Sequence, residues 1–168
     1  LLDLVLQEAE KLPELPVVID ADGLNLLAKK RLYSTLGRQY VLTPHLREMS
    51  RLSGKSVQEI ADDMTSAVMG QQAGATIVLK DARTLVSDGD WLYINLSGNS
   101  ALSTGGSGDV LSGMIGGLLA QGCTQRTAAT LAVYMHGLTA EQYCESALPH
   151  CMLARDILEM IPKIGGNS

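Results

Sequence analysis

The sequence has few cysteines, and Cys123, Cys144 and Cys151 form no recognisable metal or disulfide pattern. Their number is odd, no CxxC pair occurs, and no histidine stands at the spacing of a zinc site. A disulfide framework and a structural zinc site are therefore not expected. This cysteine usage is typical of a reducing compartment, so we expect a cytoplasmic location.

The sequence also lacks an excess of basic residues and a long hydrophobic run. The formal net charge is -5 and the isoelectric point is near 5.1, which provides no basic surface for nucleic acid or an anionic membrane. The most apolar stretch, residues 110–119, is interrupted by glycines and is too short to span a bilayer. No charged start and cleavage site of a secretory signal are recognisable. We therefore expect a soluble protein with small-molecule partners, no nucleic acid and no membrane.

No low-complexity segment occurs, and 46% of the residues are apolar against 18% charged. These proportions argue against disorder, and 168 residues suit a single domain, residues 1–168. The spacing of apolar residues predicts strands at residues 17–20, 40–42 and 75–80, a hairpin at 84–95, and helices at 1–12, 23–30, 44–52, 57–68, 110–121, 125–145 and 152–161. This alternation favours an α/β fold in which helices cover both faces of a mostly parallel central sheet with an antiparallel hairpin.

Capping residues predict where three of these helices begin. Asp22 is placed to cap the helix at residues 23–30. Thr43 and Pro44 suit the N-cap and the first helical position of the next helix, where the missing N–H of proline costs nothing. Ser56 and Glu59, three residues apart, have the pattern of a capping box.

A run of small and turn-forming residues, 104–108, leads directly into Asp109 and an apolar helix. Glycines let backbone amides approach a ligand, and the first turn of a helix leaves about four N–H groups without internal partners. Together with the helix dipole, these amides can bind a phosphate. The dipole also keeps the Asp109 carboxylate ionised, so that it can accept a proton from a substrate hydroxyl. The junction therefore suits phosphoryl transfer to an alcohol.

A simpler interpretation of the same junction is a flexible turn followed by an acid that complements the helix dipole. Other phosphate-binding motifs do not fit the sequence. It contains no GxxxxGK[ST] motif, and Gly106, Gly108 and Gly113 do not have the spacing of GxGxxG after a strand. The residues alone leave both interpretations open.

Five stretches carry a resemblance to a known family: "VVIDADGLNLL" at 17–27, "VLTPHLREM" at 41–49, "IVLKDART" at 77–84, "STGGSGDVLSGMIGGLLAQG" at 103–122 and "YMHGLTAE" at 134–141. The resemblance extends over nearly the whole chain. The sequence resembles the ADP- or ATP-dependent NAD(P)H-hydrate dehydratases, the carboxy-terminal domain of the YjeF type within the ribokinase-like superfamily. The resemblance implies a ribokinase-like fold.

The resemblance also implies a repair reaction. Hydrated NADH or NADPH, abbreviated NAD(P)HX, would be phosphorylated on its hydroxyl by ADP or ATP, and loss of phosphate would restore the nicotinamide. Asp109 would bind the hydrate and act as the base, and His45 would contact the substrate. Glu48, one helical turn after His45, would orient Mg²⁺ through water. From the residues alone, His45 could equally be a histidine at a helix start that bonds the backbone.

By the same resemblance, two segments would bind the nucleotide, and they contain Lys80, Asp81, Ala82, Arg83, Thr84, Gly105, Gly106 and Gly108. The first segment follows a strand, where open α/β sheets bind ligands. Without the resemblance, Lys80 would be interpreted as an ordinary charged strand end. Asp81 replaces a glycine common in the family and adds a negative charge, which Arg83 or Mg²⁺ would have to offset. Family members often form homo-oligomers, so we expect one here.

The sequence departs from the family at its amino-terminal side, where the family has a further portion with substrate contacts. We expect the 168 residues to lack that part of the domain. Two other functions stay open: a small-molecule kinase for a hydroxymethylpyrimidine or a thiazole alcohol, and a nucleotide-binding remnant without catalysis. Asp20 and Asn25 are further candidates for the pocket, whereas His136 and His150 are expected to be structural or exposed.

Overall fold

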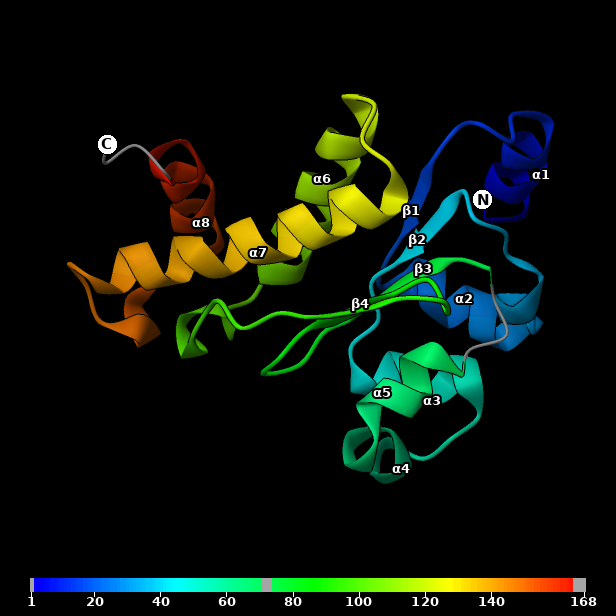
Figure 1. Ribbon diagram of the computed structural model, residues 1–168, viewed down its shortest axis with the longest axis horizontal. Helices are drawn as coiled ribbons and strands as arrows, with labels where there is room; N and C mark the ends of the chain where they lie inside the picture. Colours follow the sequence, from blue (N-terminus) through cyan, green and yellow to red (C-terminus); the bar gives the residue numbers. More distant parts are fainter. Residues whose placement is uncertain (1, 71–73, 165–168) are drawn as a thin grey trace.

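The computed structural model describes residues 2–70 and 74–164, which form one five-stranded sheet with helices on both sides (Figure 1). The strands lie side by side in chain order: β1 (Val17–Ile19), β2 (Tyr40–Leu42), β3 (Thr76–Leu79), β4 (Leu85–Ser87) and β5 (Leu92–Ile94). The first three are parallel, and β4 and β5 each run antiparallel to the strand before them. The parallel strands and the hairpin at residues 84–95 are thus confirmed.

The helices form two groups on opposite faces of the sheet (Figure 1). One group comprises α1 (Leu2–Lys11), α2 (Asp22–Lys30), α3 (Leu46–Ser53), α4 (Val57–Asp62) and α5 (Met64–Met69). The other comprises α6 (Ser107–Ala120) and α7 (Gln125–Cys144), and α8 (Ala154–Met160) packs on both of these helices. Short 3₁₀ turns occur at Tyr33–Thr35, Ser100–Leu102, Pro149–Cys151 and Ile161–Lys163. Among the described residues, no helix is both long and apolar enough to cross a bilayer.

Alternating side chains of the central strands enter two separate hydrophobic cores. In β2 and β3, Leu42 and Ile77 pack with α1 to α5, whereas Val41 and Val78 pack with α6 and α7. All four side chains are fully buried. A strand covered on both faces requires a nearly continuous apolar sequence, which explains the apolar run in β3. The expected covering of both faces is therefore confirmed.

Two predicted helix starts are wrong. Asp22 lies inside the first turn of α2, and Ala21 is the N-cap without a side-chain hydrogen bond. The next helix begins at Leu46, with His45 as its N-cap, and not at Pro44. The backbone remains extended beyond β2, because the Pro44 carbonyl accepts a hydrogen bond from the Lys80 N–H (2.8 Å) and residue 45 pairs with Lys80, the residue after β3.

Two further helices differ from their predicted bounds. The helix expected at residues 57–68 is divided at Asp63, whose extended backbone ends α4 and whose carboxylate caps α5 by accepting the Ser66 N–H (2.9 Å). Its amino-terminal capping box, Ser56 with Glu59, is confirmed. Helix α6 begins at Ser107, three residues before the predicted start. The glycine-rich segment therefore contributes to the first turn of α6.

Candidate active site

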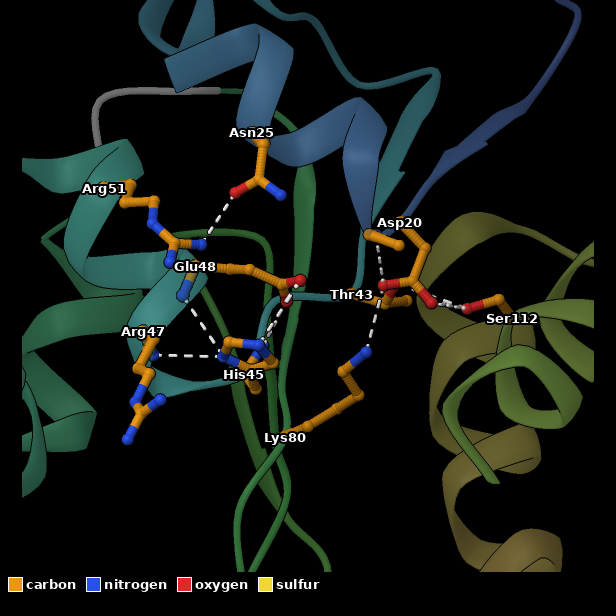
Figure 2. A network of polar contacts seen from close by, with 10 residues as sticks. Asp20, Asn25, Thr43, His45, Arg47, Glu48, Arg51, Lys80 and Ser112 are labelled. Atoms are coloured by element: carbon orange, nitrogen blue, oxygen red, sulfur yellow. Dashed lines mark hydrogen bonds and ion pairs between the residues drawn. The ribbon is translucent and has the colours of Figure 1, made fainter. Parts of the chain in front are cut away.

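A polar cluster lies where the three parallel strands end (Figure 2). Asp20 follows β1, Thr43 follows β2 and Lys80 follows β3, so parallel pairing brings them to one edge of the sheet. Asp20 Oδ1 accepts a hydrogen bond from Lys80 Nζ at 3.0 Å, and Oδ2 accepts one from Ser112 Oγ of α6 at 2.6 Å. The cluster joins residues that are 60 and 92 positions apart in the sequence.

The charge of Asp20 is stabilised inside this cluster. Its side chain is 15% exposed, and that of Lys80 is 21% exposed. Burial acts to raise the pKa of Asp20, but hydrogen bonds from Ser112, Lys80 and Thr43 and the positive charge of Lys80 outweigh it and hold the pKa below its ordinary value. Asp20 is thus an anion paired with the Lys80 ammonium at neutral pH.

The first turn of α6 lies directly beside Lys80. Its N-cap, Gly106, has a left-handed backbone (φ 86°) and provides no side-chain cap. Within the described part of the chain, the N–H groups of Gly108 and Asp109 have no hydrogen-bond acceptor. A Cβ placed on Gly108 would lie 3.3 Å from Lys80 Nζ. Two free amides and an ammonium therefore lie near one another at the positive end of a helix, which is an arrangement that binds anions.

The Asp109 side chain is exposed at this turn and forms no hydrogen bond or ion pair with another described residue. It is the acidic residue of the first turn. Its carboxylate is therefore free of partners within the described chain, and its role as a base stays a prediction.

His136 of α7 supports the same turn through hydrogen-bond contacts with Ser107, a role that was not predicted from the sequence. It is buried, and its Nε2 lies 3.1 Å from the Ser107 carbonyl oxygen and 3.2 Å from Ser107 Oγ. Burial lowers the pKa of His136 to about 4, and the nearby Lys80 charge acts in the same direction. A neutral His136 donates its Nε2–H to Ser107. His136 is therefore structural, one of the two expected possibilities. It is buried against the first turn of α6 and is not exposed.

His45 and Glu48 cap helix α3 with each other's side chains. His45 Nδ1 accepts the N–H groups of Arg47 (3.1 Å) and Glu48 (3.2 Å), and Glu48 Oε2 accepts the His45 N–H at 2.9 Å. Glu48 Oε1 lies 3.4 Å from His45 Nε2. Figure 2 shows both carboxylate oxygens turned toward His45. His45 therefore bonds backbone N–H groups at a helix start, as one interpretation of the sequence proposed. Its side chain is also half exposed and lines the cavity described in the next paragraph.

A cavity of about 720 Å³ opens beside the cluster. Five residues expected at the site line it: His45, Lys80, Asp81, Ala82 and Thr84. The lining does not include Arg83, Gly105, Gly106, Gly108, Asp109 or Glu48. Lys80 and His136 connect the cavity to the first turn of α6, because both line it and both contact that turn. Its size is in the range of pockets that bind small ligands.

Another part of the cavity wall is a loop that was not predicted to belong to the site. Asn95, Ser97, Gly98 and Asn99 belong to it, and the loop is fixed to α7 by several hydrogen bonds. The Gly98 N–H donates to Glu141 Oε1 at 2.7 Å, and Asn99 Nδ2 donates to the Ala140 carbonyl at 3.1 Å. The asparagine and serine residues after the hairpin are the one signal in the sequence for this wall.

The other candidate after β1, Asn25, does not belong to the cavity. Its Oδ1 accepts a hydrogen bond from Arg51 at 2.8 Å, which joins α2 to α3 (Figure 2). Within residues 2–70 and 74–164, no three His, Cys, Asp or Glu side chains form a cluster that could hold a metal ion. Mg²⁺ commonly binds through nucleotide phosphates and water, with few protein ligands. A carboxylate oxygen accepts more than one hydrogen bond, so Glu48 still fits an indirect role.

Known proteins resemble this chain in sequence. The family model described as NAD(P)H-hydrate dehydratase matches residues 2–163. The chain belongs to the NAD(P)H-hydrate dehydratase family. A relative from Neisseria meningitidis serogroup B, named ADP-dependent (S)-NAD(P)H-hydrate dehydratase, is 46% identical over 138 residues. That match covers 79% of this chain and 47% of the relative. A dehydratase of the same name from Bacillus subtilis is 35% identical over 89% of this chain and 54% of its own length.

Solved structures of this family have the same fold. The ADP/ATP-dependent NAD(P)H-hydrate dehydratase from Bacillus subtilis, co-crystallised with ATP and Mg²⁺, superposes with a TM-score of 0.77 at 31% identity. The match covers 89% of this chain and 53% of that one. A hydroxyethylthiazole kinase from Pyrococcus horikoshii shares the fold at 21% identity, with a TM-score of 0.73 over 92% of this chain and 62% of that one. The ribokinase-like fold is confirmed, and the chain spans about half the length of the dehydratases that it matches.

Proposed function

We propose that this chain carries out the nucleotide-dependent dehydration of NAD(P)HX. One observation carries the proposal: the uncapped first turn of α6 presents the free amides of Gly108 and Asp109 beside the Lys80 ammonium. An anion-binding turn that also contains an available carboxylate has the groups needed to hold a phosphoryl group and to deprotonate an alcohol. Membership in the dehydratase family supports the identity of that alcohol as the hydrate hydroxyl.

In the proposed reaction, the hydrate hydroxyl oxygen forms a bond to the terminal phosphorus of ADP or ATP, and AMP or ADP leaves. Asp109 accepts the hydroxyl proton, while Lys80 and the amides of residues 105, 106 and 108 stabilise the phosphoryl oxygens. The C–O bond then breaks, phosphate departs, a proton is lost from the neighbouring carbon, and the reduced nicotinamide is restored. In this scheme His45 binds the substrate and residues 80–84 line the nucleotide pocket.

Mg²⁺ would be carried by the nucleotide phosphates, and Glu48 would orient one of its waters. When bound, the ion neutralises phosphate charge during transfer. We also expect the protein to act as a homo-oligomer in the cytoplasm, as the resemblance and the cysteine usage suggest. Light scattering of the purified protein would measure the oligomeric state.

The decisive experiment supplies the intact protein with hydrated NADH, Mg²⁺ and either ADP or ATP. Recovery of the absorbance of the reduced nicotinamide, with release of one phosphate per nicotinamide, is the expected result. A stable phosphorylated product from a hydroxymethylpyrimidine or thiazole alcohol would instead identify a vitamin-precursor kinase. Nucleotide binding without any turnover, unchanged by Asp109→Asn, would identify a non-catalytic nucleotide-binding protein.

A further inference from the structure

We propose that Asp20 is a positioning residue, which fixes the Lys80 ammonium against the first turn of α6 and thereby sets the affinity of the site for a nucleotide phosphate. The inference rests on the proposed function, because it assumes that a nucleotide phosphate binds at this turn. Both oxygens of the Asp20 carboxylate are engaged within the protein, Oδ1 by Lys80 and the Ala21 N–H and Oδ2 by Ser112. Asp20 therefore acts on the ligand through Lys80.

The position of Lys80 is defined by Asp20. Lys80 leaves β3 at the edge of the sheet, and its Nζ donates to Asp20 Oδ1 at 3.0 Å (Figure 2). No other described side chain forms an ion pair with this ammonium. A lysine has four rotatable bonds and little preferred direction of its own. Lys80 Nζ lies 3.3 Å from where a Cβ on Gly108 would be, and this position thus depends on the Asp20 carboxylate on the other side of the ammonium.

Asp20 can perform this role because its own carboxylate is immobilised. Oδ1 also accepts the Ala21 N–H at 2.8 Å, and Oδ2 accepts the Ser112 hydroxyl at 2.6 Å. Ser112 in turn lies 3.3 Å from the Thr43 hydroxyl. The carboxylate is thereby held by the backbone at the start of α2, by Lys80 after β3 and by Ser112 of α6, and Ser112 links it to the segment after β2. Charge-assisted hydrogen bonds of this kind are shorter and stronger than neutral ones.

A phosphate at the turn would complete an alternating row of charges. The ammonium would lie between the Asp20 carboxylate on one side and the phosphate on the other. Without Asp20, the ammonium would keep its charge near the phosphate but lose the fixed geometry, and the lysine would have to be ordered when the nucleotide binds. Ordering a long side chain on binding reduces affinity. The loss is therefore expected in nucleotide binding, and only when Lys80 is present.

The test measures the dissociation constant of ADP with Mg²⁺ by calorimetry on the intact protein. Asp20→Asn is expected to weaken ADP binding about tenfold, and Lys80→Met by a similar or larger factor. The double variant should bind ADP within about twofold of Lys80→Met alone, because the two residues act as one unit. Asp22→Asn, an exposed carboxylate two residues away, is the matched control and should bind ADP like the unmodified protein.

Three results would overturn the inference: unchanged or tighter ADP binding by Asp20→Asn, equal loss in the presence and absence of Lys80, or no effect of Lys80→Met. Lack of ADP binding by the unmodified protein would overturn it as well. If Asp20→Asn does not fold, Asp20→Glu keeps the charge but displaces the ammonium by one methylene, and the same comparison with Lys80→Met applies. Failure of the proposed function looks different, because turnover is then absent while ADP binding still depends jointly on Asp20 and Lys80.

Discussion

Helices α3 and α6 both begin at the carboxyl edge of the sheet, and their first turns are built in opposite ways. In α3, His45 and Glu48 satisfy the first backbone N–H groups with their own side chains. In α6, the N-cap is Gly106, no side chain caps the helix, and the amides of Gly108 and Asp109 are free within the described chain. A helix start whose N–H groups are bonded by its own side chains has no free donors for an anion, whereas the free N–H groups of an uncapped start can bind one.

The open turn of α6 is nevertheless held firmly, from outside. His136 of α7 bonds the Ser107 carbonyl, and a Cβ on Gly106 would lie 3.1 Å from the Ala154 Cβ, which shows how closely α8 approaches. Lys80 lies on the remaining side, beside Gly108. Neighbouring elements thus give this turn the rigidity that α3 obtains from its own cap. Rigidity without a cap is what a preorganised anion site requires.

The first prediction concerns the acid in the open turn and has the largest expected effect. Asp109→Asn should lower turnover by about two to four powers of ten, because it removes the proposed base without changing its size. ADP affinity and the free energy of unfolding should change little. Steady-state kinetics with NAD(P)HX and calorimetry with ADP measure the two quantities. Asp62→Asn, which changes an exposed carboxylate of α4, is the control. Near-normal turnover of the Asp109→Asn variant would remove Asp109 from the mechanism.

The second prediction concerns the support that His136 gives to the open turn. Its pKa of about 4 in the fold lies below the value near 6.5 of an unfolded histidine, so the unfolded chain binds more protons between these pH values. The free energy of unfolding should therefore fall as the pH decreases from 6.5 toward 4, by on the order of 3 kcal/mol. Burial disfavours the charged imidazolium and the Lys80 charge repels it, so protonation of His136 destabilises the fold.

Urea unfolding between pH 7 and 5 measures this slope, because the carboxylates whose pKa is lowered, such as Asp20 and Asp88, lose their contribution only at more acidic pH. His136→Gln, which can still donate to Ser107, should flatten the slope. His150→Gln, at an exposed position, should retain it. An equal slope in His136→Gln would contradict the assignment.

The third prediction concerns the backbone that starts α6. Gly106 has φ 86° and close contact with Ala154, so Gly106→Ala introduces both left-handed strain and a tight contact. It should lower the free energy of unfolding by roughly 1–2 kcal/mol. Gly105→Ala is a sharp control, because a Cβ there meets no atom within 4 Å. Equal stability of the two variants would show that the left-handed start of α6 is dispensable.

The contrast between the two helix starts also marks what sequence can predict. The free turn of α6 followed from local information, since glycines 105, 106 and 108 and the acid at 109 lie within five consecutive residues. The parallel pairing of the central strands followed from the alternation of strands with helices. The α3 start was mispredicted because Thr43 and Pro44 suit a cap, whereas pairing with Lys80 keeps this segment extended.

Contacts between distant residues were beyond sequence reasoning. Asp20 was recognised as a pocket candidate, but its partners Lys80 and Ser112 lie 60 and 92 residues away. His136 was expected to be structural or exposed, because one histidine in a helix gives no sign of the turn that it supports. Such pairs are fixed by how α6 and α7 pack on the sheet, which no local pattern specifies.

The last prediction has the smallest expected effect and tests the side-chain cap at the start of α3. His45→Ala removes the Nδ1 acceptor for the N–H groups of Arg47 and Glu48, and should lower the free energy of unfolding by about 1 kcal/mol. His45→Asn should restore most of it, because asparagine is among the best N-cap residues. Arg47→Ala leaves the backbone N–H in place and should cost less than about 0.5 kcal/mol. If His45→Ala were as stable as His45→Asn, the cap would contribute nothing, and the His45 ring would be positioned for the cavity alone.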